Sequence, residues 1–326
     1  MDQNPVVVQP GPLRGSHAAA AKPLVLIHDG GGTVFGYFSL GNLKRKVWGV
    51  SNPHYSTAEP WAGGMDEMAD HYIALIEKAG IRGPVLLGGW SLGGYLALLI
   101  AHKLKDRVSS PFSVSGLVLV DSPFHLPASQ LTPCDAAPKL DHLPELVRKS
   151  FNIADGMLQT WELPEFDDPA CGSQPVRFSV GSGRSFTVQP GTAMHKTLDG
   201  KWHVVEAKSF TAAQRAEAQA PPSPPDSDSG RFSPAAALAR DSSGLPPALL
   251  IRCVLPTATE GDAPEGASQV DLYRADPYLG WGDHYHDFIK VIVDTEESHF
   301  NVFQFSHVSG FPFLLFFPFC ISRLWH

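Results

Sequence analysis

Residues 85–94, Val-Leu-Leu-Gly-Gly-Trp-Ser-Leu-Gly-Gly, decide the fold of this chain. A short apolar run ends in the pattern Gly-x-Ser-x-Gly, with Ser91 between Gly89 and Gly93, and an apolar helical stretch follows at 95–105. So tight a turn between a strand and a helix requires flanking residues without side chains, and it exposes the serine Oγ. The pattern therefore predicts that Ser91 is a nucleophile at the N-terminus of a helix.

The segments around this turn predict a parallel β-sheet. β-Branched apolar runs alternate with amphipathic stretches such as 65–78, in which apolar residues recur at helical spacing. This alternation is typical of a parallel sheet covered on both faces. Because the carboxyl ends of parallel strands meet at one edge, we expect Gly30, Ser91 and Asp121 to converge there. The expected strands are residues 23–28, 46–50, 85–89, 117–121, 248–254 and 289–293.

A serine hydroxyl needs a general base, and the base needs a group that orients it. His299 lies just after the last expected strand, where the α/β-hydrolase order Ser, Asp, His has its base. We therefore assign His299 as the base. His284, His286 and His307 lie nearby in the sequence but lack this placement.

The orienting acid is assigned to Asp121. This residue ends the strand that follows the nucleophile helix, so its carboxylate is expected at the same edge of the sheet as Ser91. Many α/β-hydrolases take the acid one strand later, where Asp262, Asp271 or Asp276 are the alternatives.

The triple-glycine turn at residues 29–32 is the candidate second half of an oxyanion hole. It follows the first expected strand, where the fold supplies one backbone N–H donor, and the N–H of Leu92 supplies the other. Gly30 is the preferred donor and Asp29 the second choice. The turn lacks the Gly-Lys-Ser/Thr of a phosphate-binding loop.

These elements predict an α/β-hydrolase fold with a mostly parallel central sheet, helices on both faces and a long lid insertion. The βα alternation lapses after residue 123 and resumes near 246, and the Pro-, Ser- and Asp-rich composition near 215–240 predicts disorder there. We divide the chain into an N-terminal extension (1–22), a first core part (23–123), the lid insertion (124–245), a second core part (246–305) and an apolar C-terminal tail (306–326).

Six short motifs narrow the assignment further. They are Ile-His-Asp-Gly-Gly-Gly at 27–32, Gly-Val-Ser-Asn-Pro at 49–53, Gly-Pro at 83–84, Gly-Gly-Trp-Ser-Leu-Gly-Gly at 88–94, Leu-Val-Asp-Ser-Pro at 119–123 and Ser-His-Phe-Asn-Val-Phe at 298–303. With them the chain resembles the thioesterase domains that release products from fungal polyketide synthases and nonribosomal peptide synthetases. The resemblance covers residues 23–125 and 248–304. In that family the acid follows the strand after the nucleophile helix and the base lies in a His-Phe loop, which agrees with Asp121 and His299.

The resemblance implies a free-standing serine thioesterase of secondary metabolism. Its substrate would be an acyl or polyketide chain on a phosphopantetheine thioester, delivered by an acyl carrier protein or synthase acting in trans, with no metal or organic cofactor. A carboxylesterase would use the same residues. A non-catalytic binding protein of the same fold is the alternative from another class, although an intact Ser91, Asp121 and His299 favours an enzyme.

Composition and charge exclude other classes. A formal charge of −8, with no basic cluster, argues against nucleic-acid binding. Four scattered cysteines and the absence of a signal-like N-terminus predict a cytoplasmic protein with reduced thiols. The apolar run at 311–320 has five phenylalanines and two prolines, and it is too short to cross a membrane as a helix. We expect no stable membrane insertion and interpret the tail as foreign to the native enzyme.

Overall fold

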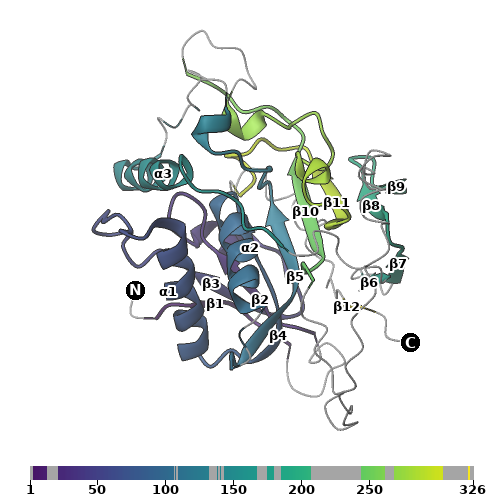
Figure 1. Ribbon diagram of the computed structural model, residues 1–326, viewed down its shortest axis with the longest axis horizontal. Coiled ribbons are helices and arrows are strands. Elements are labelled where there is room, and N and C mark those ends of the chain that lie inside the picture. Colours follow the sequence, from purple (N-terminus) through teal and green to yellow (C-terminus); the bar gives the residue numbers. More distant parts are fainter. Residues whose placement is uncertain are drawn as a thin grey trace, which may run out of the picture.

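The molecule is built on one large, mostly parallel β-sheet (Figure 1). The computed structural model describes residues 3–12, 21–105, 107, 109–131, 138, 140, 143–166, 175–179, 185–206, 244–260, 268–303 and 322–323. Within them the strand order is β1-β3-β2-β4-β5-β10-β11-β8-β9, parallel from β3 to β8 and antiparallel at the two edge pairs. The predicted α/β-hydrolase sheet is confirmed. Its strands are β1 (Val6–Pro10), β2 (Leu24–Ile27), β3 (Lys46–Val50), β4 (Gly83–Trp90), β5 (Phe112–Val120), β8 (Thr192–Lys196), β9 (Trp202–Glu206), β10 (Ala248–Cys253) and β11 (Ile289–Thr295).

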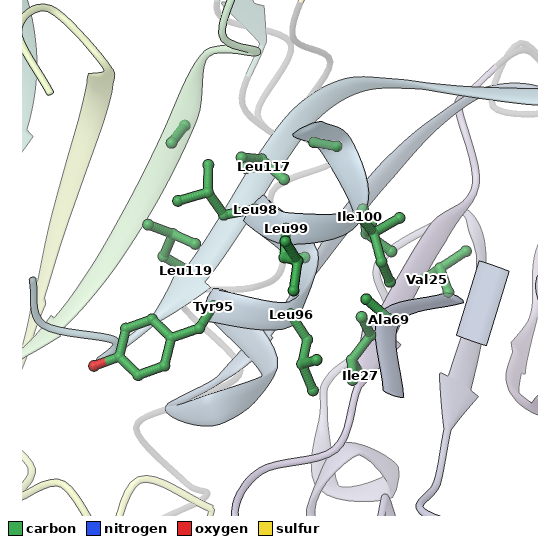
Figure 2. Packing of buried hydrophobic residues seen from close by; sticks show 14 of the residues in the cluster. Val25, Ile27, Ala69, Tyr95, Leu96, Leu98, Leu99, Ile100, Leu117 and Leu119 are labelled. Carbon is green, nitrogen blue, oxygen red and sulfur yellow. The ribbon is translucent and has the colours of Figure 1, made fainter. Parts of the chain in front are cut away.

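Three α-helices contribute to the apolar cluster on one face of this sheet. They are α1 (Gly64–Lys78), α2 (Leu92–Leu104) and α3 (Glu145–Leu158). Helix α2 is the most deeply buried, and its Leu96 and Ile100 share the cluster with Val25 and Ile27 of β2 (Figure 2). Burial of such aliphatic side chains contributes about 1.5–3 kcal/mol each. The helix that follows the serine is therefore held firmly against the strands that carry the site.

The opposite face is covered differently from the expectation of helices on both faces. In the described part of the chain, its apolar cluster is closed by the short 3-10 helix η2 (Phe35–Ser39), by Phe303 and by the strands β6 (Val176–Ser179) and β7 (Ser185–Val188). Side chains alternate along β2, so Leu24 and Leu26 belong to this second cluster while Val25 and Ile27 belong to the first.

Two expected boundaries need correction. The segment 1–22 is not merely an extension, because β1 pairs antiparallel with β3 at the edge of the sheet. Proline is tolerated at sheet edges, so the proline at the end of β1 does not prevent pairing. The segment 124–245 is not all lid either, because β8 pairs with β11 and forms a hairpin with β9. The sheet thus resumes at Thr192, well before residue 246.

Some sequence predictions fall outside the described residues. These include the segment near 215–240, Asp262, His307 and most of the 306–326 tail. Two tail residues are described, and they form β12 (Ser322–Arg323), which pairs antiparallel with β6. Among the described helices, none combines the length and the apolar character that crossing a membrane requires.

Candidate active site

Ser91 occupies a strained turn between β4 and α2. Its backbone has φ 52° and ψ −117°, a region that side-chain-bearing residues rarely adopt. The carbonyl oxygen of Ile27 approaches both flanking glycines so closely that a Cβ at Gly89 or at Gly93 would lie 2.4 Å from it. Only glycine fits at either position. The close approach of β2 is therefore the reason why the pattern has glycine on both sides of the serine.

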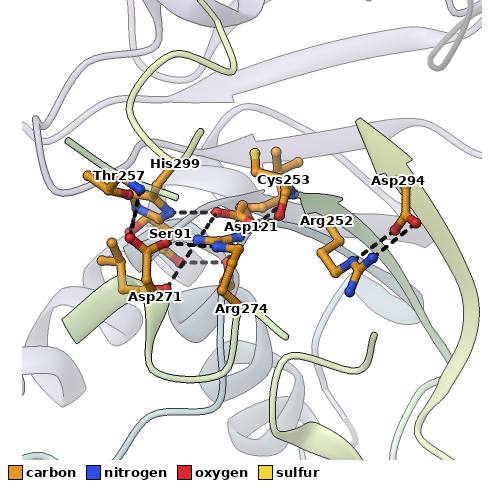
Figure 3. Close-up of polar contacts among 12 residues, drawn as sticks. Ser91, Asp121, Arg252, Cys253, Thr257, Asp271, Arg274, Asp294 and His299 are labelled. Carbon is orange, nitrogen blue, oxygen red and sulfur yellow. Dashed lines mark hydrogen bonds and ion pairs between the residues drawn. The ribbon is translucent and has the colours of Figure 1, made fainter. Parts of the chain in front are cut away.

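The structure brings Ser91, His299 and Asp121 into one contact chain (Figure 3). Oγ of Ser91 lies 3.1 Å from Nε2 of His299, and Nδ1 of His299 lies 2.8 Å from Oδ2 of Asp121. His299 follows β11 and Asp121 follows β5, and both side chains are buried. When Nδ1 of His299 carries its proton and donates it in a hydrogen bond to Asp121, Nε2 is free to accept the serine proton.

Asp121 is kept ionised by its surroundings. Its Oδ1 accepts the backbone N–H of Cys253 at 2.8 Å, and both carboxylate oxygens accept the guanidinium of Arg274 at 2.6 and 2.9 Å. Burial raises the pKa of Asp121, but the hydrogen bond with His299 and the charge of Arg274 outweigh it and lower the pKa to about 2. The carboxylate is therefore charged at neutral pH.

The described alternatives to Asp121 and His299 have other contacts. Asp271 accepts Nε of Arg274 at 2.8 Å and the backbone N–H of Thr257 at 2.7 Å. Asp276 accepts the backbone N–H groups of two turn residues, at 3.0 and 3.2 Å. The ring of His284 stacks on Phe124 with centroids 3.9 Å apart. These three side chains thus support the fold around the site rather than the serine.

The side chain of His28 links the glycine turn after β2 to helix α1. Its Nδ1 lies 2.5 Å from the carbonyl oxygen of Asp29, and its Nε2 lies 2.5 Å from the hydroxyl of Tyr72. Burial lowers the pKa of His28 to about 4, so the ring is neutral at pH 7. The neutral ring donates from Nδ1 and accepts from the Tyr72 hydroxyl, which holds the turn in place without adding a charge.

The turn also contains a buried carboxyl group. Burial raises the pKa of Asp29 to about 7, although hydrogen bonds from the backbone N–H groups of Gly31 and of Asp29 itself act in the opposite direction. The N–H of Asp29 thus interacts with its own side chain, and Gly30 stays the expected donor of the turn. Leu92 is the first residue of α2, so its N–H has no partner within the helix.

Comparison with known proteins identifies the family. A model of the thioesterase domain matches residues 22–160. A probable thioesterase of Curvularia clavata, KK1J, is 45% identical over 305 residues, which cover 93% of this chain and 90% of that protein. This chain belongs to the thioesterase family. A second relative, the probable thioesterase lcsE of Purpureocillium lilacinum, is 39% identical over 310 residues, covering 93% of this chain and 91% of its own.

The fold of this thioesterase also occurs in a larger enzyme. A four-domain nonribosomal peptide synthetase, in a crystal structure with AMP and glycine, is similar over 96% of this chain and 20% of its own length. The TM-score is 0.50 and the identity 17%, so the likeness concerns the fold alone.

A cavity of about 200 Å³ is lined by Trp90, which precedes Ser91 in the chain, and by Phe300, which follows His299. Aromatic side chains from widely separated parts of the chain line it, namely Tyr37, Trp90, Phe151, Phe300 and Phe303, together with Asp29. Val147 and Phe151 come from α3, and the ring of Phe151 would touch a Cβ placed on Gly30 at 2.7 Å. The part of the expected lid that α3 represents therefore lies against the candidate oxyanion turn.

Two functional neighbours were missed at the level of sequence. Arg274 and Cys253 hold Asp121 but belong to no motif, and only the i, i+3 spacing of Asp271 and Arg274 hints at an ion pair. In the described residues, no group of three or more His, Cys, Asp or Glu side chains is arranged to hold a metal ion. The arrangement is suited to proton transfer from a hydroxyl group and to nucleophilic attack by the resulting alkoxide.

Proposed function

We propose that this thioesterase releases an acyl chain from a phosphopantetheine thioester through an acyl-Ser91 intermediate. The observation that carries the proposal is the unbroken series of contacts from Ser91 through His299 to Asp121, at 3.1 and 2.8 Å. A hydroxyl, an imidazole and a buried carboxylate in this order form the standard machinery of acyl transfer.

The proposed reaction has two halves. His299 takes the proton of Ser91 as Oγ attacks the thioester carbonyl, and it returns this proton to the departing thiol. Water, or a hydroxyl of the acyl chain itself, then attacks the acyl-serine while His299 takes its proton. The bond between the acyl carbon and Oγ of Ser91 breaks, His299 returns the proton to Oγ, and the acid or the cyclised ester leaves. Asp121 keeps Nδ1 protonated throughout and stabilises the imidazolium. No step requires a metal ion or an organic cofactor.

The oxyanion formed in each half is assigned to two backbone donors, the N–H groups of Leu92 and Gly30. Leu92 lies at the N-terminus of α2, where unpaired N–H groups and the helix dipole favour negative charge. Gly30 lies in the turn that His28 and Tyr72 hold rigid. Preorganised donors of this kind contribute about 10²–10³ each in turnover.

The acyl chain is assigned to the cavity lined by Trp90 and Phe300. Its aromatic lining favours an apolar chain, and its volume of about 200 Å³ admits only a compact segment of it. The phosphopantetheine arm would arrive from an acyl carrier protein or synthase acting in trans, in line with the motifs shared with releasing domains of synthases.

The proposal is tested by trapping the intermediate. Purified protein is mixed with an acyl-N-acetylcysteamine thioester and, separately, with the matching oxygen ester, and tryptic peptides are analysed by mass spectrometry after rapid acid quenching. We expect the acyl mass on the peptide containing Ser91, with faster turnover of the thioester. Faster turnover of the oxygen ester would instead indicate a carboxylesterase. Resistance to a fluorophosphonate probe, with no acyl-serine, would indicate a binding protein.

A further inference from the structure

We infer that Arg274 is a positioning residue for the reaction, which acts by fixing the Asp121 carboxylate against His299. The inference rests on the proposed function, since it assigns Asp121 the role of orienting acid. It adds a member that neither the motif nor the family comparison supplies. Arg274 lies after β10, between the 3-10 helix η5 (Gln269–Asp271) and the buried turn at Tyr278.

The contact between the two side chains is bidentate. Nη1 of Arg274 lies 2.6 Å from Oδ1 of Asp121, and Nη2 lies 2.9 Å from Oδ2. The planar fork of a guanidinium matches the two oxygens of a carboxylate, so this pair fixes the plane of the acid as well as its distance. A lysine would supply the charge without that constraint.

Every acceptor position of the acid is thereby used. Oδ2 accepts His299 and Arg274, while Oδ1 accepts Arg274 and the backbone N–H of Cys253. A carboxylate offers about four lone-pair sites, and here three residues supply four donors. Rotation of the carboxylate away from His299 would break at least one charge-assisted bond at a side chain that has no exposed surface.

Arg274 is itself locked in place. Its Nε donates to Asp271 at 2.8 Å, and Nη1 also donates to the carbonyl oxygen of Cys253 at 2.7 Å. The second oxygen of Asp271 accepts the backbone N–H of Thr257. Figure 3 shows the resulting series from Thr257 through Asp271 and Arg274 to Asp121 and His299. A guanidinium held on both sides has little freedom to leave the acid.

The charge of Arg274 also balances the site. Around Asp121 lie His299, Arg274 with Asp271 behind it, the thiol of Cys253 and the hydroxyl of Tyr95. Burial raises the pKa of both Cys253 and Tyr95, so these two groups are neutral near pH 7. Without Arg274, the buried carboxylate of Asp121 would contact His299 with no fixed cation beside it, and an uncompensated carboxylate favours the protonated form of a neighbouring imidazole. A protonated His299 cannot act as a base.

A matched pair of substitutions tests this role. Arg252 binds Asp294 through Nε and Nη2 at 2.8 and 3.0 Å, so it forms the same kind of partly buried bidentate pair, but with a carboxylate that does not contact the candidate triad (Figure 3). Arg274→Met and Arg252→Met are compared in the full chain by kcat, KM, thermal unfolding and the pH dependence of kcat/KM. Arg274→Lys is added to separate charge from geometry.

For Arg274→Met we expect kcat to fall about 10- to 100-fold, by analogy with the loss when a partner that orients a metal ligand is removed, with KM little changed. The acidic limb of the kcat/KM profile should move to higher pH by up to about one unit. Arg274→Lys should keep the limb near its wild-type position while kcat still falls, because the charge remains and the fork is lost. Arg252→Met should alter thermal stability only.

The inference is overturned if folded Arg274→Met keeps the wild-type kcat and pH profile, or if it merely matches Arg252→Met. Should Arg274→Met not fold, Arg274→Lys and Asp271→Asn, which removes the charged partner of Nε of Arg274, decide the question by the same profile. A wild-type protein that is not labelled at Ser91 by a fluorophosphonate would overturn the proposed function itself. Labelled wild type with an unaffected Arg274 series would overturn only the role of Arg274.

Discussion

Oγ of Ser122 lies 2.8 Å from the carbonyl oxygen of Ser91, to which it donates a hydrogen bond. Ser122 directly follows Asp121, so the end of β5 supports the nucleophile turn as well as carrying the candidate acid. Its own carbonyl oxygen accepts Nε1 of Trp281 at 2.8 Å. Trp281, which lies 159 residues after Ser122 in the chain, thus bonds to the residue that supports the nucleophile turn.

Because Ser122 contacts Ser91, the same change to alanine can be made at each serine and the two effects compared. Ser91→Ala should lower acyl release by several orders of magnitude, toward the loss of about 10⁶ seen for a comparable nucleophile, without loss of stability. Ser122→Ala should cost about 1 kcal/mol of stability and less than about tenfold in rate, because it removes a support and leaves the hydroxyl that reacts. Rates and urea denaturation are measured for both, with the exposed Ser113→Ala as a control. A Ser91→Ala protein that keeps a tenth of the wild-type rate would refute the proposed nucleophile.

The acid is tested by removing its charge. Asp121→Asn should reduce turnover by about 10⁴, because an amide next to Nδ1 favours the wrong tautomer of His299. Asp276→Asn should stay within about tenfold of wild type, since the carboxylate of Asp276 accepts the backbone N–H groups of Tyr278 and Gly280, whereas His299 contacts Asp121. Single-turnover kinetics on a thioester give both values. The reverse order of effects would move the acid to the later strand.

Gly93 tests the turn. In Gly93→Ala the new Cβ would lie 2.4 Å from the carbonyl oxygen of Ile27 and 2.7 Å from that of His28, both rigid backbone atoms. We expect a loss of more than about 3 kcal/mol of stability, at or above the upper range for overpacking, or failure to fold. Gly156→Ala in α3 is the matched control. A Cβ there meets nothing within 4 Å, so this change should stabilise by up to about 1 kcal/mol. Equal denaturation midpoints for the two variants would contradict the close approach.

Asp29 predicts a pH-dependent stability. Its folded pKa of about 7 lies above the ordinary value of 3.8, so the folded state keeps a proton that the unfolded chain loses between these values. Stability therefore falls as pH rises from about 4 to about 7 and levels off above. Asp29→Asn lacks this group, so its stability relative to wild type should increase over the same interval, by up to about 4 kcal/mol at about 1.4 kcal/mol per unit. Urea midpoints measured at pH 4.5, 6 and 8 check this. A difference that does not change with pH would contradict the raised pKa.

The sequence predicted those parts of the molecule that obey local rules. Ser91, Asp121 and His299 could be placed because each follows a strand, and parallel strands end at one edge of the sheet. Arg274 could not, because its role depends on a contact with Asp121, 153 residues earlier, which no periodicity encodes. Strand β1 was missed because flanking prolines indicate a loop, and β8 because it has only five residues and no alternation of buried and exposed side chains. In both cases pairing with neighbouring strands outweighed the local signal.

The wall that α3 contributes to the cavity has a consequence for the diversification of these enzymes. The candidate triad residues Ser91, Asp121 and His299 all follow strands of the central sheet, whereas Val147 and Phe151 belong to a helix outside it. Substitutions on that helix can reshape the chamber for a longer, shorter or bulkier chain while the chemistry stays intact. After gene duplication, substitutions in α3 would change which acyl chains the enzyme accepts. Directed evolution for altered chain length should therefore begin with a library at Val147 and Phe151.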